Sequence, residues 1–161
     1  MLTKGINFTN FKKKYKIQST KKKLEIIIKE NNAIIQSLGK FYKYSFKKKN
    51  IKKYTKNYNF RVIGMGGSSL GTKAIYDFLK HKIKKKFQFI DNLNSQYLID
   101  NKKKYVNLVV SKSGNTIETV INSNVIIKNK DKNIFITENK NSYLYSFAKK
   151  LKADIIHHNN F

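Results

Sequence analysis

Two turns in this chain contain residue types that could bind a ligand. Residues 64–71 read Gly-Met-Gly-Gly-Ser-Ser-Leu-Gly, and residues 111–119 read Ser-Lys-Ser-Gly-Asn-Thr-Ile-Glu-Thr. Each turn follows a short apolar run and precedes a helical pattern. Small residues in the first turn let the backbone approach a ligand closely, and the hydroxyl groups of the second can donate hydrogen bonds. Together they suit the binding of a phosphate monoester.

The second turn is rich in hydrogen-bond donors, and the oxygens of a phosphate dianion can only accept hydrogen bonds. Ser111, Ser113 and Thr116 carry hydroxyl groups, and backbone amides at a helix start also donate. The helix dipole contributes roughly 0.3 to 1 kcal/mol, whereas each hydrogen bond to a charged group contributes about 1.5 to 3 kcal/mol. Hydrogen bonds therefore decide the affinity, which we expect to be micromolar to millimolar.

Helix capping is the structural alternative for both turns. Asn115 with Glu118 fits a capping box, and Ser68 or Ser69 can cap the earlier helix. One cap needs one side chain, however, and the second turn offers more than that, so we favour phosphate binding. A dinucleotide fingerprint is disfavoured because Ser69 stands where its third glycine belongs, and the Gly-Lys-Ser/Thr of nucleotide hydrolases is absent.

Alternating strand-like and helical runs must position these turns. From residue 60 onward, apolar runs predict strands at residues 60–65, 87–91, 105–111, 133–137 and 154–157. The intervening segments predict helices at residues 69–82, 95–101, 116–129 and 142–151. This order is typical of a parallel sheet with crossover helices, whose strand carboxyl ends share one edge. Both turns then lie at that edge, where ligands of such sheets bind.

The first part of the chain has a different pattern. Residues 1–59 form a basic helical leader and connector ahead of a domain at residues 60–161. Between Ser19 and Gly39, apolar side chains recur at helical spacing opposite Lys and Glu, which predicts one amphipathic helix. A membrane surface could receive such a helix, but we favour packing against the following domain. Residues 40–59 are interpreted as a connector.

Charge is the most unusual bulk property. The chain has 35 Lys+Arg and 9 Asp+Glu, hence a net charge of +26, which could bind polyanions. We favour compositional drift over a specific nucleic-acid groove, because the lysines occur as scattered triplets. Without cysteine there is no disulfide framework, and no signal peptide or membrane-spanning run is present. A cytoplasmic protein without membrane partners is expected.

The two turns, about forty residues apart and each after a strand, closely resemble those of glucose-6-phosphate isomerases. The resemblance runs from Arg61 to the end, although Thr72 replaces a frequent proline. It implies a sugar-isomerase domain: a flavodoxin-like, three-layer α/β/α fold with a five-stranded parallel sheet after the helical leader. It also implies a cofactor-free enzyme of glycolysis and gluconeogenesis that interconverts glucose 6-phosphate and fructose 6-phosphate through an enediol, as a homodimer when full length.

The resemblance further implies a site that binds without catalysing. Its substrate-binding residues would be Gly67, Ser68, Ser111, Lys112, Ser113, Gly114, Asn115 and Thr116. No catalytic residue is expected in this chain, because Glu118, the one carboxylate in the motifs, suits a structural role. Adjacent His157 and His158 point to opposite sides of a strand and predict no metal site. The chain is interpreted as partial and inactive alone; a stand-alone phosphosugar-binding regulatory domain is the alternative.

Overall fold

The computed structural model describes residues 17–30, 32–37, 39, 41–56, 59–94, 103–128, 131–138 and 140–158. Residues up to Lys43 form one compact unit, and the residues from Tyr44 onward form a second. The first unit contains α1 (Ile17–Lys29) and α2 (Ala33–Ser37) where one helix was predicted. The Asn32 side chain explains the interruption, because its Oδ1 accepts a hydrogen bond from the Ile34 amide, 2.9 Å away, and so starts a new helix.

The second unit is built on a five-stranded parallel sheet. Its strands are β1 (Asn59–Ile63), β2 (Lys86–Ile90), β3 (Tyr105–Val110), β4 (Lys132–Thr137) and β5 (Asp154–His157). All five were predicted, with bounds that differ by two residues or fewer. The order β2-β1-β3-β4-β5 is that of flavodoxin-like sheets. The chain moves outward in opposite directions from β1 and β3, so a topological switch point lies between these two neighbouring strands.

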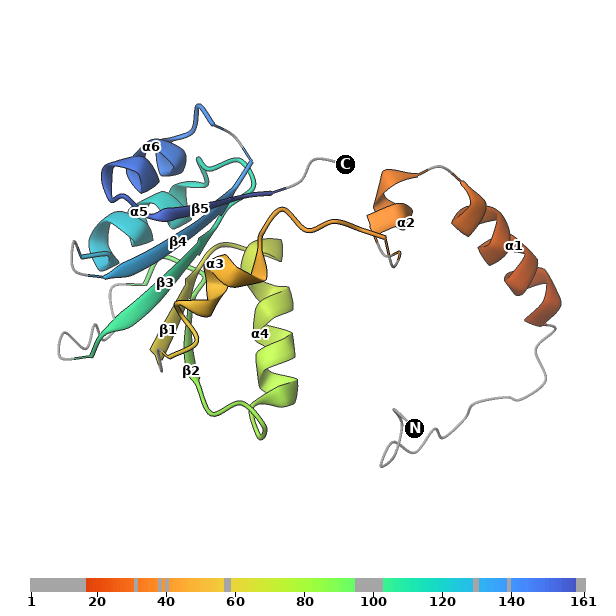
Figure 1. Ribbon diagram of the computed structural model, residues 1–161, viewed down its shortest axis with the longest axis horizontal. Helices are drawn as coiled ribbons and strands as arrows, with labels where there is room; N and C mark the ends of the chain where they lie inside the picture. The colour runs from red at the N-terminus through yellow and green to blue at the C-terminus, as the bar shows by residue number, and fades with distance from the viewer. Residues whose placement is uncertain are drawn as a thin grey trace. The chain divides into compact units, whose positions relative to one another are not determined.

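Helices cover both faces of the sheet, giving the predicted three layers (Figure 1). On one face lie α5 (Ile117–Ile126) and α6 (Tyr143–Lys150), and on the other lie α3 (Lys48–Lys52) and α4 (Gly67–Leu79). The predicted helix at residues 95–101 lies outside the described residues. No helix within the described part of the chain combines the length and apolar character needed to cross a bilayer.

Alternating strand residues form one apolar core on each face. Beneath α5 and α6, buried side chains of the sheet and the helices pack together: Ile63, Ile90, Val109, Ile126, Phe135, Leu144 and Ala148. The opposite core comprises Tyr54, Phe60, Val106 and Ile134. Because both faces are buried, the strands are apolar at most positions, which is why the sequence predicted them well, although Arg61, Asn107 and Asn133 are also buried in them.

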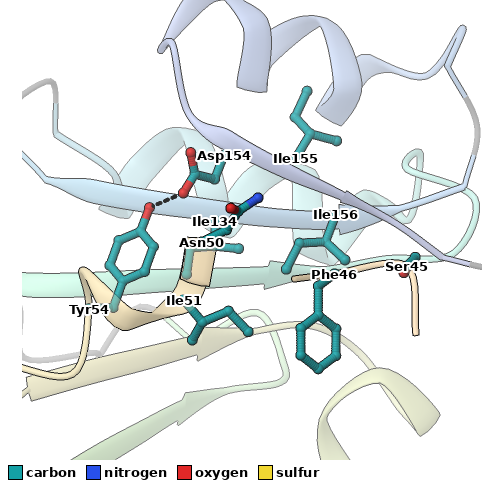
Figure 2. Close-up of a pocket in the computed structure, with 9 residues that line it drawn as sticks. All are labelled: Ser45, Phe46, Asn50, Ile51, Tyr54, Ile134, Asp154, Ile155 and Ile156. Carbon is teal, nitrogen blue, oxygen red and sulfur yellow. Dashed lines mark hydrogen bonds between the residues drawn. The ribbon is translucent and has the colours of Figure 1, made fainter. Parts of the chain in front are cut away.

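Tyr54 joins the segment interpreted as a connector to the last strand. Its ring is buried, and its hydroxyl donates a 2.6 Å hydrogen bond to Asp154 Oδ2 (Figure 2). The same carboxylate oxygen lies 2.6 Å from Lys53 Nζ. A small cavity beside this contact is lined by apolar side chains such as Phe46 and Ile51 and by polar ones such as Ser45 and Asn50. Residues 44–56 are therefore part of the α/β unit, and α3 is a helix that the sequence did not predict.

The contact between Tyr54 and Asp154 shifts the pKa of both side chains. Burial, the hydrogen bond to Asp154 and that carboxylate's charge raise the pKa of Tyr54 well above its ordinary value. Burial alone would raise the pKa of Asp154, but hydrogen bonds from Lys53 and Tyr54 and the charge of Lys53 outweigh burial and lower it. The contact is therefore strongest with the tyrosine neutral and the aspartate ionised.

We predict that Tyr54→Phe lowers the free energy of unfolding by about 1 to 2 kcal/mol, because it removes a hydrogen bond to a carboxylate. Urea denaturation at neutral pH measures this. Tyr143→Phe is the matched control: the Tyr143 hydroxyl donates to the neutral Asn124 Oδ1 at an exposed position, 2.8 Å away, and its loss should cost less than about 0.5 kcal/mol. Equal costs for the two variants would contradict a special role for Tyr54.

We also predict an acid-dependent loss of stability through Asp154. Its pKa is lower in the folded protein than the unfolded value of about 3.9, so its contribution is fully present above that value. The contribution disappears as the pH falls through the folded pKa. Asp154→Asn should therefore flatten the acid limb of a stability profile below about pH 4. Asp77→Asn, at an exposed carboxylate, should leave that limb unchanged.

Candidate functional site

The structure brings the two turns together at the carboxyl edge of the sheet. Ile63 and Val109 are paired in register on neighbouring strands, so the segments that follow them begin side by side. A Cβ atom added to Gly64 would lie 2.8 Å from the Val110 carbonyl oxygen. Glycine is therefore required at residue 64 for the first turn to pass the end of β3. The prediction that the two turns share one edge of the sheet is confirmed, and the strand order places them at the switch point.

The hydroxyl groups of the second turn form a row. Ser111 Oγ lies 3.1 Å from Thr116 Oγ1, which lies 3.5 Å from Ser113 Oγ. The two serine oxygens also accept hydrogen bonds from the amides of Gly114 and Asn115, at 3.1 and 3.3 Å. A hydroxyl that accepts from an amide is polarised and becomes a better donor. Ser111 is buried, Thr116 is half-buried and Ser113 is exposed, so the exposed end of the row can donate toward an anion while Ser111 supports it from behind.

The capping-box alternative is not found at α5. Thr116 occupies the position before the helix, and its side chain makes no capping hydrogen bond to the first turn. Asn115 instead uses its Oδ1 to accept from the Tyr143 amide at the start of α6, 2.9 Å away. The amino terminus of α5 therefore retains unsatisfied amides and its positive dipole end beside the hydroxyl row.

The first turn has open space beside it. Gly66, at φ +55°, precedes α4, and no side chain caps this helix, so the capping alternative for Ser68 and Ser69 is not found here either. Ser69 is buried and donates from its Oγ to the Gly66 carbonyl, 3.3 Å away. Gly67 is exposed, and a Cβ there would meet no atom within 4 Å. This space adjoins the turn predicted to face a sugar.

Contacts from β4 and α6 support the second turn from behind. The Lys112 carbonyl accepts from the Glu138 amide at 3.1 Å, and the Gly114 carbonyl accepts from the Leu144 amide at 3.0 Å. Gly114 has φ +69°, and an added Cβ would collide with Ser142 and lie 2.8 Å from Thr137 Oγ1. Only glycine fits this position, so its place in the motif is explained by both conformation and space.

Two ion pairs flank the turns. Lys112 Nζ lies 3.8 Å from Glu138 Oε2, and Lys73 Nζ lies 3.6 Å from Asp91 Oδ2. Sequence reasoning singled out Glu118 and missed Glu138. The available signal was that Glu138 directly follows the predicted strand at residues 133–137, which places it at the ligand-binding edge.

The histidines at the end of β5 lie apart from the hydroxyl row. The His157 ring lies 6.0 Å from the ring of Tyr145 on α6, and the His158 amide donates to the Thr137 carbonyl. Within the described residues, no three His, Asp or Glu side chains gather as a metal would require. The two histidines thus contribute to the packing and hydrogen bonding of the β5 end.

Comparison with solved structures reveals the same fold. A hypothetical protein from Thermus thermophilus superposes with a TM-score of 0.60 at 18% identity, covering 88% of this chain and 38% of that one. Tagatose-6-phosphate ketose/aldose isomerase from Escherichia coli superposes with a TM-score of 0.53 at 18% identity, covering 69% of this chain and 35% of that one. At these identities the likeness establishes the α/β architecture alone.

Sequence comparison is more specific, although no protein-family model matches the chain. The glucose-6-phosphate isomerase of Methanocaldococcus jannaschii is 40% identical over 91 residues, covering 49% of this chain and 22% of the relative. That of Acholeplasma laidlawii is 36% identical over 132 residues, covering 70% of this chain and 30% of the relative. The chain therefore spans less than a third of these relatives. Over that part, its sequence is similar to those of these glucose-6-phosphate isomerases.

Proposed function

We propose that this chain is the phosphosugar-binding part of a glucose-6-phosphate isomerase, which interconverts glucose 6-phosphate and fructose 6-phosphate through an enediol. The observation that carries the proposal is the hydroxyl row of Ser111, Ser113 and Thr116 in front of the uncapped start of α5. The row lies at the switch point of the sheet, beside the open glycine turn. The sequence relatives supply the substrate class.

In this proposal the phosphate group lies in front of α5. The hydroxyls of the row donate to its oxygens, and amides in the first turn of the helix add further donors. Gly114 and Asn115 act through the backbone, because their amides already polarise the serine hydroxyls. The sugar extends toward Gly67 and Ser68, where the space beside the first turn is open. No cofactor is needed for either contact.

We further propose that turnover requires groups from the rest of a longer protein. Moving a proton between C1 and C2 needs a positioned base. The described carboxylates at this edge are otherwise engaged or placed on a helix: Asp91 pairs with Lys73, Glu138 pairs with Lys112, and Glu118 lies in the first turn of α5. None is assigned to catalysis, so the chain alone binds without isomerising.

The homodimer expected for the full-length protein and its cytoplasmic location stay predictions. An apolar row on the outer face of α5 offers a surface for association: Ile117, Ile121 and Val125 are 64%, 40% and 66% exposed. This surface lies apart from the buried face of α5, which packs on the sheet through Thr119 and Ile126. A nucleic-acid or membrane partner is not part of the proposal.

Titration with fructose 6-phosphate tests the proposed site. We predict millimolar or tighter binding to the chain at about 0.15 M salt, and at least about 100-fold weaker binding after Ser111, Ser113 and Thr116 are all changed to alanine. Calorimetry or NMR titration measures both affinities. Ser146→Ala is the control, because Ser146 is an exposed hydroxyl residue on α6. Thermal unfolding must show that the triple variant remains folded.

Three outcomes of this experiment are informative. Equal affinities of the original chain and the triple variant would remove the site assignment and leave attraction by net charge as the explanation. A coupled isomerase assay on the same sample separates binding from turnover. Turnover at an enzyme-like rate would contradict the proposed lack of a base. Binding without turnover in a complete natural protein of this length would favour the stand-alone regulatory domain.

The left-handed backbone conformation of Gly114 in the second turn gives a separate prediction. Gly114→Ala should lower the free energy of unfolding by at least about 1 to 2 kcal/mol, because it forces a side chain into a left-handed conformation and against Ser142. It should also weaken phosphosugar binding. Gly67→Ala is the matched control for stability, since its added methyl group meets no atom within 4 Å and its φ is not positive. Chemical denaturation of both variants checks this, and comparable losses would contradict it.

A further inference from the structure

Glu138 is the least satisfied ionisable group beside the second turn. Its Oε2 is buried, has no hydrogen-bond partner, and lies 3.8 Å from Lys112 Nζ. The Glu138 side chain is 24% exposed, whereas that of Lys112 is 67% exposed. The carboxylate is thus largely covered at the end of β4, while the lysine reaches it from the solvent side.

The main chain of Glu138 also touches the turn. Its amide donates to the Lys112 carbonyl, 3.1 Å away. In a planar trans peptide the carbonyl and the following N–H point in opposite directions. The Ser113 amide is therefore directed away from β4. Glu138 contacts Lys112 twice, through the backbone and through the carboxylate, and only the second contact depends on its side chain.

We propose that Glu138 is a positioning residue that moderates phosphate affinity by holding the Lys112 ammonium against the end of β4. A bound phosphate dianion must compete with this carboxylate for the lysine. The hydroxyl row then provides most of the affinity, and the substrate is released readily. This inference rests on the proposed function, because it concerns the same phosphate cradle, and it adds a residue outside both motifs.

Other roles for Glu138 fit the geometry less well. Glu138 Oε2 is buried, so this oxygen is poorly placed to accept a hydrogen bond from a sugar hydroxyl. At 3.8 Å the Lys112 ammonium and the Glu138 carboxylate make no hydrogen bond, as is also true of the exposed pair of Lys80 with Asp77 at 3.9 Å. The pair is therefore loose enough for a dianion to draw the lysine away.

A double-mutant cycle tests this inference with inorganic phosphate and fructose 6-phosphate as probes. The full chain, Glu138→Gln, Lys112→Met and the double variant are titrated under identical salt. We expect Glu138→Gln to bind both probes about two- to fivefold more tightly, since an ion pair of this exposure is worth about that much. In the Lys112→Met background the same change should give no gain. Asp77→Asn controls for loss of one negative charge away from the turn.

The titration results distinguish a failure of the inference about Glu138 from a failure of the proposed function. An unchanged or weaker affinity of Glu138→Gln overturns the inference, provided that its thermal unfolding matches that of the original chain. An equal gain with and without Lys112 also overturns it, because Glu138 would then act directly on the ligand. If the original chain binds neither probe better than the Ser111, Ser113 and Thr116 triple variant, the proposed function fails, and the inference fails with it.

Discussion

The candidate site depends on hydrogen bonds that tie the second turn to the strand and helix behind it. The carbonyls of Lys112 and Gly114 accept from the amides of Glu138 and Leu144, and Gly114 fits only because it lacks a side chain. With these carbonyls turned toward β4 and α6, the hydroxyl row is left in front of α5. The turn is thereby ordered before a ligand arrives, which reduces the entropy lost on binding.

The sequence predicted the sheet and the meeting of the two turns for a physical reason. Strands buried on both faces are apolar at most positions, as Val62, Ile63 and Phe135 show, so their positions are visible without a structure. Parallel strands then place their carboxyl ends at one edge. The sequence did not reveal the break between α1 and α2, because Asn32 can cap a helix or lie within a polar stretch with equal ease.

Contacts between distant polar side chains could not be predicted in the same way. Tyr54 and Asp154 are 100 residues apart and meet only because α3 lies over the face of the sheet on which β5 presents its aspartate. Glu138 meets Lys112 only because β4 neighbours β3 in register. Such pairs depend on strand order and on the face a side chain occupies, neither of which is encoded in local hydrophobic periodicity.

The net charge and the candidate cradle make separable contributions to ligand binding. A charge of +26 attracts any anion and accelerates encounter, and salt screens this effect. The cradle itself offers mainly neutral hydroxyls, and its single lysine already faces the carboxylate of Glu138. Attraction by the surface therefore cannot distinguish a phosphosugar from another anion, whereas a fixed row of donors can. Selectivity in this chain must come from hydrogen-bond geometry, and the abundant lysines set only how often a ligand arrives.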